Sequence, residues 1–260
     1  MIVLISPAKR LDYESPVAVK DYTQPRFLDD SQALIDELVN YTPKRIGKLM
    51  SLSDNLAELN AERYRSFELP FTADTARQSI YAFKGDVYVG LEAETLTKRD
   101  INFAQKHLRI LSGLYGVLKP LDLIQPYRLE MGADLKNKRG KNLYEFWDTR
   151  ITESLNEELV TVKSPLIVNL ASNEYFKSVK VKQLSGRLVS PVFKDEKNGE
   201  YKIISFFAKK ARGAMARYII QNRIKSLKGL TEFNGLGYAY DEQSSTDAEP
   251  VFKRAEQVAG

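Results

Sequence analysis

The chain has 260 residues, with 39 Lys and Arg against 34 Asp and Glu, no Cys and a single His. The absence of Cys excludes disulfide frameworks, thiol peroxidases, iron–sulfur clusters and Cys-based zinc sites, and a single His excludes multi-His metal centres. With 43% hydrophobic and 28% charged residues, the composition is typical of a globular protein with a sizeable core.

The apolar run at the N-terminus, Ile2–Ile5, is too short for a signal peptide. No stretch of the sequence approaches the ~18 apolar residues of a membrane-spanning helix. We therefore expect a cytoplasmic protein with no membrane contact and no disulfide-linked partner. Its oligomeric state does not follow from the sequence.

In chain order, the first predicted element is a buried strand over Ile2–Ile5. Helices are then expected over residues 28–40, 43–50, 54–66, about 97–111 and about 143–156. Pro43 behind Thr42, and Ser53 before the third of these segments, are typical helix starts. Trp147 is expected to be buried.

The second half of the chain is predicted to contain more strands. Residues 166–170 are typical of a central strand. Residues 188–193 and 201–206 flank Asn198-Gly199, which predicts an antiparallel hairpin. The expected edge strands are residues 238–240 and 251–253.

The alternation of strands and helices contains no repeat, and no Pro-, Gly- or Ser-rich linker divides the chain. We therefore predict one compact α+β domain over residues 1–260, built from a mixed sheet and helices. The C-terminal tail, 252–260, is expected to be frayed.

Positive charge is concentrated in residues 201–230, which hold eight Lys and Arg and no Asp or Glu. This segment is +8, whereas the other 230 residues hold 39 − 8 = 31 basic and 34 acidic groups and are −3. On a helical wheel the cations lie opposite an apolar face, with Gly213 and Ala216 among them, which would let a phosphate backbone approach. We interpret the segment as a phosphate-binding helix acting through Lys209, Lys210, Arg212 and Arg217. A solvated amphipathic helix is the alternative.

A second candidate is the glycine pair Gly113 and Gly116 within residues 108–121. A helix, a glycine hairpin and a following Leu/Pro segment resemble a helix-hairpin-helix element, whose backbone N–H groups hold a DNA phosphate. The glycines are three apart where the usual pair is two apart, and a C-capping glycine before a turn is the alternative. The candidate DNA contacts of this segment are Arg109, Ser112, Gly113, Tyr115, Gly116 and Lys119.

A third set consists of charged residues in short motifs, namely Lys9, Lys84, Asp86, Arg128, Glu130 and Glu174. Asp86, Glu130 or Glu174 could act as a general base beside Lys84 and Arg128, or the set could be structural ion pairs and helix caps. The chain has no P-loop, no dinucleotide-binding glycine motif and no zinc-protease or serine-hydrolase motif, so no catalytic residue, metal site or cofactor is assigned. His107, between two basic residues, is expected at the surface.

These motifs together resemble the YaaA family of bacterial peroxide stress resistance proteins. The matching segments are residues 4–9, 11–13, 82–88, 111–116, 120–122, 125–132, 143–147, 169–176 and 208–213. The resemblance implies a cytoplasmic protein that protects cells against hydrogen peroxide by limiting unincorporated iron and DNA damage. It also implies binding of double-stranded DNA through a positively charged cleft and a helix-hairpin-helix element within an α+β fold.

We therefore predict a stress protein that binds double-stranded DNA largely without sequence specificity, with Lys9, Lys84 and Arg128 lining the same cleft as the basic helix. The alternative is an enzyme that acts on nucleic acid or on a phosphorylated small molecule through the third set of residues. Direct sequestration of iron by carboxylates is the least favoured hypothesis.

Overall fold

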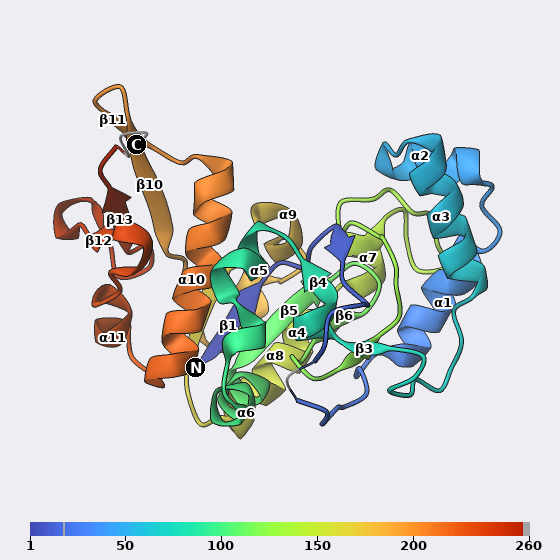
Figure 1. Ribbon diagram of the computed structural model, residues 1–260, viewed down its shortest axis with the longest axis horizontal. Coiled ribbons are helices and arrows are strands. Elements are labelled where there is room, and N and C mark those ends of the chain that lie inside the picture. Colours follow the sequence, from blue (N-terminus) through green and yellow to red (C-terminus); the bar gives the residue numbers. More distant parts are fainter. Residues whose placement is uncertain (18, 257–260) are drawn as a thin grey trace.

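A five-stranded sheet lies at the centre of the computed structural model, which describes residues 1–17 and 19–256 (Figure 1). In spatial order its strands are β6 (Gly116–Leu118), β5 (Leu108–Ser112), β1 (Ile2–Ile5), β8 (Leu166–Leu170) and β9 (Arg187–Val189). Four of them run parallel, and β6 is antiparallel to β5. β1 and β8 are buried along their whole length, as parallel strands covered on both faces must be, so both strand predictions are confirmed.

A second sheet contains β11 (Glu200–Lys202), β10 (Val192–Lys197), β13 (Val251–Arg254) and β12 (Ala239–Tyr240), in that order. The hairpin between β10 and β11 is confirmed, with left-handed φ values of 56° at Asn198 and 77° at Gly199. The strand expected at 188–193 is divided between the two sheets, and the strand expected at 201–206 ends at Lys202, because a helix begins at Ser205. β13 is an inner strand, so residues 252–254 are paired and not frayed, whereas 257–260 lie outside the described residues.

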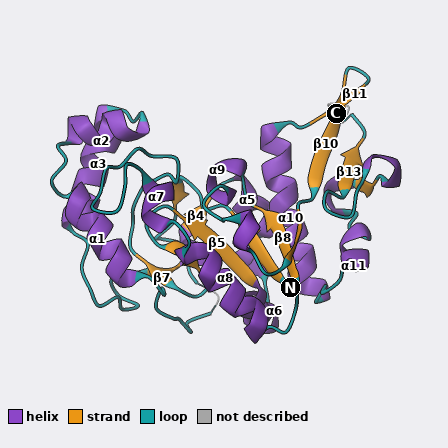
Figure 2. Cartoon of the chain, turned by 180° about the vertical axis from the view of Figure 1, so that it is seen from behind, coloured by secondary structure: helices purple, strands orange, loops and turns teal. Residues whose placement is uncertain are grey.

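Three helices form the end of the molecule farthest from the second sheet: α1 (Leu28–Leu38), α2 (Pro43–Met50) and α3 (Asp54–Arg65) (Figures 1 and 2). Thr42 Oγ1 accepts a hydrogen bond from the Arg45 N–H, which confirms the predicted start of α2. The helix expected at 143–156 is two helices, α7 (Leu143–Trp147) and α8 (Arg150–Thr161), because Asp148 adopts a left-handed φ of 41°. Trp147 is buried, as predicted.

Short elements cover the remaining chain around the central sheet. β2 (Arg10–Leu11) pairs with β4 (Phe83–Lys84), and β3 (Arg77–Gln78) pairs with β7 (Leu123–Ile124). The short helices are α4 (Ser79–Ala82), α5 (Asp86–Leu91), α9 (Asn173–Phe176) and α11 (Leu227–Thr231).

The helix α10 (Ser205–Asn222) lies between the two sheets and packs closely on α5 (Figure 1). A Cβ on Gly213 would overlap the Val87 carbonyl oxygen and lie 2.9 Å from the Leu91 nitrogen, and a Cβ on Gly90 would overlap the Lys210 carbonyl oxygen. Gly213 is buried in this contact, and Ala216 is buried as well. The expectation that these small residues open α10 to a phosphate backbone is therefore wrong, because neither is accessible and Gly213 admits another helix.

Residues 108–121, expected to form a helix-hairpin-helix, form a β-hairpin instead. The helix α6 (Lys98–His107) ends at His107, and the chain continues as β5 because it pairs there with β1. The turn leads into β6 at Gly116, the first residue of that strand, which has a left-handed φ of 68° and where a Cβ would lie 2.8 Å from the Trp147 ring. Trp147 Nε1 also donates a 2.9 Å hydrogen bond to the Gly113 carbonyl oxygen. The glycine pair serves this turn and the packing of Trp147.

The hydrophobic core is continuous and includes side chains from both sheets, such as Val3 and Phe193. The chain therefore forms a single domain, and the predicted α+β class is confirmed. Among residues 1–17 and 19–256, no helix combines the length and the apolar character that crossing a membrane requires.

Candidate functional site

The polar motifs of the sequence meet at the carboxyl edge of the parallel strands. β1 and β8 are neighbours in this sheet. Along the chain, the next strand of the sheet after β1 is β5, which lies on the side of β1 away from β8. The next strand after β8 is β9, which lies on the side of β8 away from β1, so the strand order reverses between β1 and β8. Open α/β sheets bind ligands at such a switch point, since the loops diverge there and leave a crevice. Ser6 Oγ, after β1, accepts a 2.8 Å hydrogen bond from the Ser172 N–H, after β8, which ties the two loops together.

A loop that includes Arg128 and Glu130 crosses this edge; an ion pair links it to the segment after β1, and a hydrogen bond links it to α9, after β8. Glu130 Oε2 lies 2.8 Å from Lys9 Nζ, and Glu130 Oε1 lies 3.0 Å from Arg128 Nη2. Farther along the loop, the Gly132 N–H donates a 3.0 Å hydrogen bond to Glu174 Oε1. The structure thus brings together four of the charged residues singled out in the sequence.

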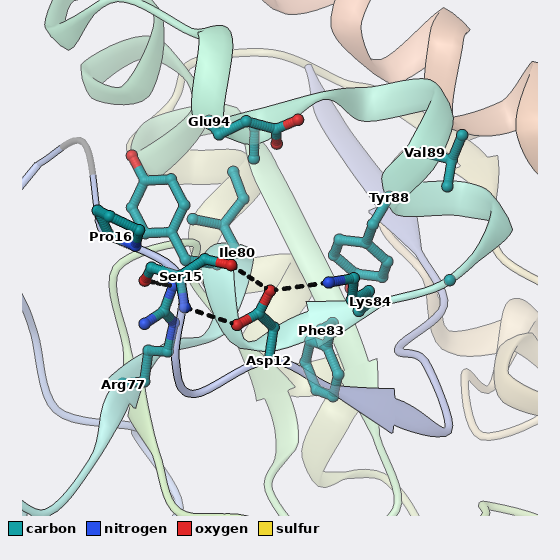
Figure 3. A pocket seen from close by; sticks show the side chains of 13 residues that line it. Asp12, Ser15, Pro16, Arg77, Ile80, Phe83, Lys84, Tyr88, Val89 and Glu94 are labelled. Atoms are coloured by element: carbon teal, nitrogen blue, oxygen red, sulfur yellow. Dashed lines mark hydrogen bonds and ion pairs between the residues drawn. The ribbon is translucent and has the colours of Figure 1, made fainter.

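Lys84 lies beside this cluster on the antiparallel ribbon formed by β2 and β4, where its backbone lies opposite that of Arg10. Its Nζ lies 3.1 Å from Asp12 Oδ2. No hydrogen bond or ion pair joins the Lys84 and Asp86 side chains. Hydrogen bonds from the Ser15 backbone and hydroxyl hold the pKa of Asp12 well below its usual range (Figure 3). Asp86 is half-buried in the first turn of α5 and makes no side-chain hydrogen bond or ion pair to another described residue.

Two adjoining pockets of about 260 and 420 Å³ open around Lys84 and share Asp12 and Ser15. We call them together the Lys84 groove. Its other charged lining residues are Arg10, Glu14, Arg63, Arg77 and Glu94. The groove therefore carries four cations against three carboxylates, and Asp12 is already neutralised by Lys84.

The four cations expected on the basic helix have different surroundings. Lys209 is exposed, Lys210 is half-buried, and neither makes an ion pair with a described residue. Arg212 is half-buried, and burial lowers the pKa of its guanidinium. Arg217 donates hydrogen bonds to the carbonyl oxygens at the end of α5, at residues 91 and 92. Two of the four cations, Lys209 and Lys210, are thus placed to bind an external anion.

The candidates of the glycine segment are mostly enclosed. Arg109 donates to the Glu158 carboxylate and to backbone carbonyls, and Ser112 Oγ lies 2.6 Å from the Tyr127 hydroxyl. The other buried members are Gly113, Tyr115 and Gly116. Lys119 is exposed, but it follows β6, which runs back along β5, and therefore lies at the opposite end of the sheet from Lys9. This segment does not line the Lys84 groove.

His107 was expected at the surface, and this expectation is wrong. Its ring is buried and its Nδ1 lies 2.8 Å from the Met1 carbonyl oxygen. Burial lowers the pKa of the imidazole.

Sequence reasoning missed three residues of the groove. Asp12 lies in segment 11–13, which matches the family, so the sequence already marks this residue. Its ion pair with Lys84 is visible only in the structure. Arg77 and Tyr81 stand in none of the motifs, and only the fold brings them beside Asp12. Within residues 1–17 and 19–256, no group of three or more His, Cys, Asp or Glu side chains is arranged to hold a metal ion.

Comparison with protein families gives a match over most of the chain. A family model described as peroxide stress protein YaaA matches residues 1–244. The chain belongs to this family. The resemblance inferred from the motifs is therefore confirmed, and family membership supports a role in peroxide stress.

Proposed function

We propose that this peroxide stress protein binds double-stranded DNA in the cytoplasm, largely without sequence specificity, and so helps to limit oxidative DNA damage and the unincorporated iron that causes it. The phosphate-binding residues are Lys9, Lys84, Lys209 and Lys210. The observation that carries the proposal is that α5 connects the two basic elements: Lys84 lies two residues before α5, and the Lys210 backbone packs on Gly90 within it.

The two lysines of the sheet edge can exchange their present partners for phosphate. The side chains of Lys9 and Lys84 are 61% and 55% exposed, although each makes an ion pair with a carboxylate. The partner carboxylates of Glu130 and Asp12 are only 20% and 14% exposed, but each keeps other hydrogen-bond donors, from Arg128 and from Ser15, when the lysine turns to a phosphate oxygen. Neither carboxylate is therefore left without a partner by the exchange. Lysines that contact phosphates do not read bases, and the binding is therefore expected to be insensitive to sequence.

The test is duplex binding measured by fluorescence anisotropy at several salt concentrations. Four phosphate contacts predict a slope of log K against log salt of about −3.6. The double variant Lys209→Glu/Lys210→Glu should weaken binding at least about tenfold and reduce the slope towards about −1.8. The matched control, Lys106→Glu/Lys119→Glu, changes the net charge equally but lies at the amino end of the sheet, and it should bind nearly as the wild type does. Equal losses in the two double variants would refute the proposed surface.

The iron and DNA-damage part of the proposal is tested in cells. A strain without the protein should contain more chelatable iron and more DNA lesions after hydrogen peroxide exposure. The wild-type gene should restore both quantities, and the Lys209→Glu/Lys210→Glu variant should not. Full restoration by a variant that no longer binds duplex would separate iron control from DNA binding and contradict the combined proposal.

A second candidate is an enzyme that acts on nucleic acid or on a phosphorylated small molecule, with Asp86, Glu130 or Glu174 as the base and Lys84 and Arg128 as phosphate ligands. It is favoured by the position of Glu130 and Glu174 at the switch point of the sheet. Its test is incubation of DNA and of phosphorylated small molecules with the protein, with and without Mg²⁺. Tight duplex binding without strand cleavage, base release or phosphate release would favour the binding protein.

A further inference from the structure

The inner part of the Lys84 groove is a pocket of about 260 Å³ with a largely apolar wall (Figure 3). Ile80 and the three aromatic residues Tyr81, Phe83 and Tyr88 line it. The volume lies slightly below the roughly 300–1,000 Å³ of pockets that hold drug-sized ligands. The pocket therefore has room for one small ring system and not for a longer chain.

Two of the residues that line this pocket, Tyr81 and Arg77, each carry an enclosed polar atom that has no partner among the described residues. The Tyr81 hydroxyl accepts and donates no hydrogen bond, although Tyr81 is only 7% exposed. Arg77 Nε is also unsatisfied, and a 2.6 Å hydrogen bond from Arg77 Nη2 to the Ser15 carbonyl oxygen holds the guanidinium in place. Because enclosed polar atoms in folded proteins are nearly always hydrogen-bonded, these two atoms indicate a ligand that supplies the missing partners.

The polar groups of the pocket offer both donors and an acceptor to such a ligand. Arg77 Nε–H donates, and the Glu94 carboxylate, which lines the same pocket, accepts. Burial raises the pKa of the Tyr81 hydroxyl to about 12, so this group stays protonated at neutral pH and can donate as well as accept. A flat heterocycle with ring nitrogens and exocyclic oxygens or amino groups presents the complementary pattern on its edge.

We propose that this pocket receives a single heterocyclic base, turned out of the DNA that binds at Lys84. The inference rests on the proposed function, because Lys84 and Val89 stand at the pocket and Lys84 is one of the proposed phosphate ligands. A backbone held at Lys84 places the neighbouring nucleotide at the pocket. Stacking between apolar and aromatic side chains, together with hydrogen bonds to the base edge, is how proteins hold an extrahelical base.

The test uses a duplex with a central 2-aminopurine, whose fluorescence rises when the base leaves the stack. Saturating wild-type protein should raise the fluorescence severalfold, and anisotropy of the same duplex verifies that it is bound. Val89→Trp, which adds a large side chain at a position that is 53% exposed and therefore tolerant, should abolish the rise. Tyr81→Phe removes only the hydroxyl and should reduce the rise. The matched controls Val160→Trp and Tyr22→Phe alter exposed residues outside the pocket and should behave as the wild type does.

A second arm adds free 2-aminopurine riboside to the protein without DNA. If the wild-type protein raises the fluorescence of the duplex and the pocket variants do not, the pocket is assigned to an extrahelical base. A change of riboside fluorescence alone, removed by Val89→Trp, assigns it to a free nucleoside and refutes the extrahelical base. Binding of the duplex without any change in either arm overturns the inference and leaves the proposed function intact. Failure to bind the duplex at all refutes the proposed function and the extrahelical base with it.

Discussion

Replacing Gly213 by Ala tests the close packing of α10 on α5. The added methyl group would overlap the Val87 carbonyl oxygen and lie 2.8 Å from the Val87 carbonyl carbon, where real Cβ atoms keep at least 3.0 Å. The obstructing atoms belong to the backbone, so no side-chain rotation relieves the overlap and the helices must separate. Overpacking of this kind costs about 1–3 kcal/mol, here towards the upper end. Ala recovers about 0.5–1 kcal/mol through its better helix propensity, which leaves a net loss of about 2 kcal/mol.

Urea unfolding followed by far-UV circular dichroism and by the fluorescence of the single Trp147 measures this loss. For a chain of this size, about 2 kcal/mol corresponds to a decrease in Tm of about 4–8 °C. Gly47→Ala is the matched control, because Gly47 also lies within a helix but its Cβ would meet the nearest atom at an ordinary 3.4 Å. It should stabilise the protein by about 0.5–1 kcal/mol. A Gly213→Ala variant as stable as the wild type would refute the close contact between the helices.

Three further predictions concern titration and turns. Burial raises the pKa of Asp122 from 3.8 to about 6, so its contribution to stability is full below pH 3.8 and is lost as the pH rises through 6. In Asp122→Asn the free energy of unfolding should therefore change less with pH between 3.8 and 6 than it does in the wild type. The same slope in both proteins would contradict the assignment. The pKa of His107, the only imidazole of the chain, should lie below 6.5 in an NMR titration, since burial disfavours the charged form. The contribution of His107 to stability is therefore present above pH 6.5 and is lost as the pH falls. A measured pKa at or above 6.5 would contradict this. Gly116→Ala should lower the Tm more than Gly199→Ala, because both have left-handed φ values but only Gly116 faces the Trp147 ring; equal losses would argue against that contact.

The elements that were predicted correctly are those whose determinants are local. The helix over Pro43–Met50 begins at a proline behind a capping threonine, and both signals act within one turn. The hairpin at Asn198-Gly199 is similar, because its two residues tolerate left-handed φ values wherever they occur. Local chemistry alone is sufficient in such segments.

The segment after His107 was mispredicted for the opposite reason. Its leucines and isoleucine are compatible with a continued helix. The chain nevertheless forms β5 there, because β1, at the start of the chain, is available to pair with it. Similarly, a helical wheel assumes one buried face, whereas α10 packs against α5 as well as between the two sheets. The wider buried arc takes up Gly213 and Ala216 and leaves fewer cations for an external ligand.

The sequence by itself determined the α+β class, the family and the segments that contain the charged groups, since composition, periodicity and short motifs are properties of neighbouring residues. It also determined that the modest net charge of +5 comes from one +8 segment. Only the tertiary structure decided which charges meet. Glu130 is held by Lys9 and Arg128, Lys84 pairs with Asp12, and Arg77 and Tyr81 line a pocket together with Lys84 and Asp12. Apart from the Arg128–Glu130 pair, these contacts join residues far apart in the chain, and no local pattern specifies them because they depend on which strands and loops the fold brings together.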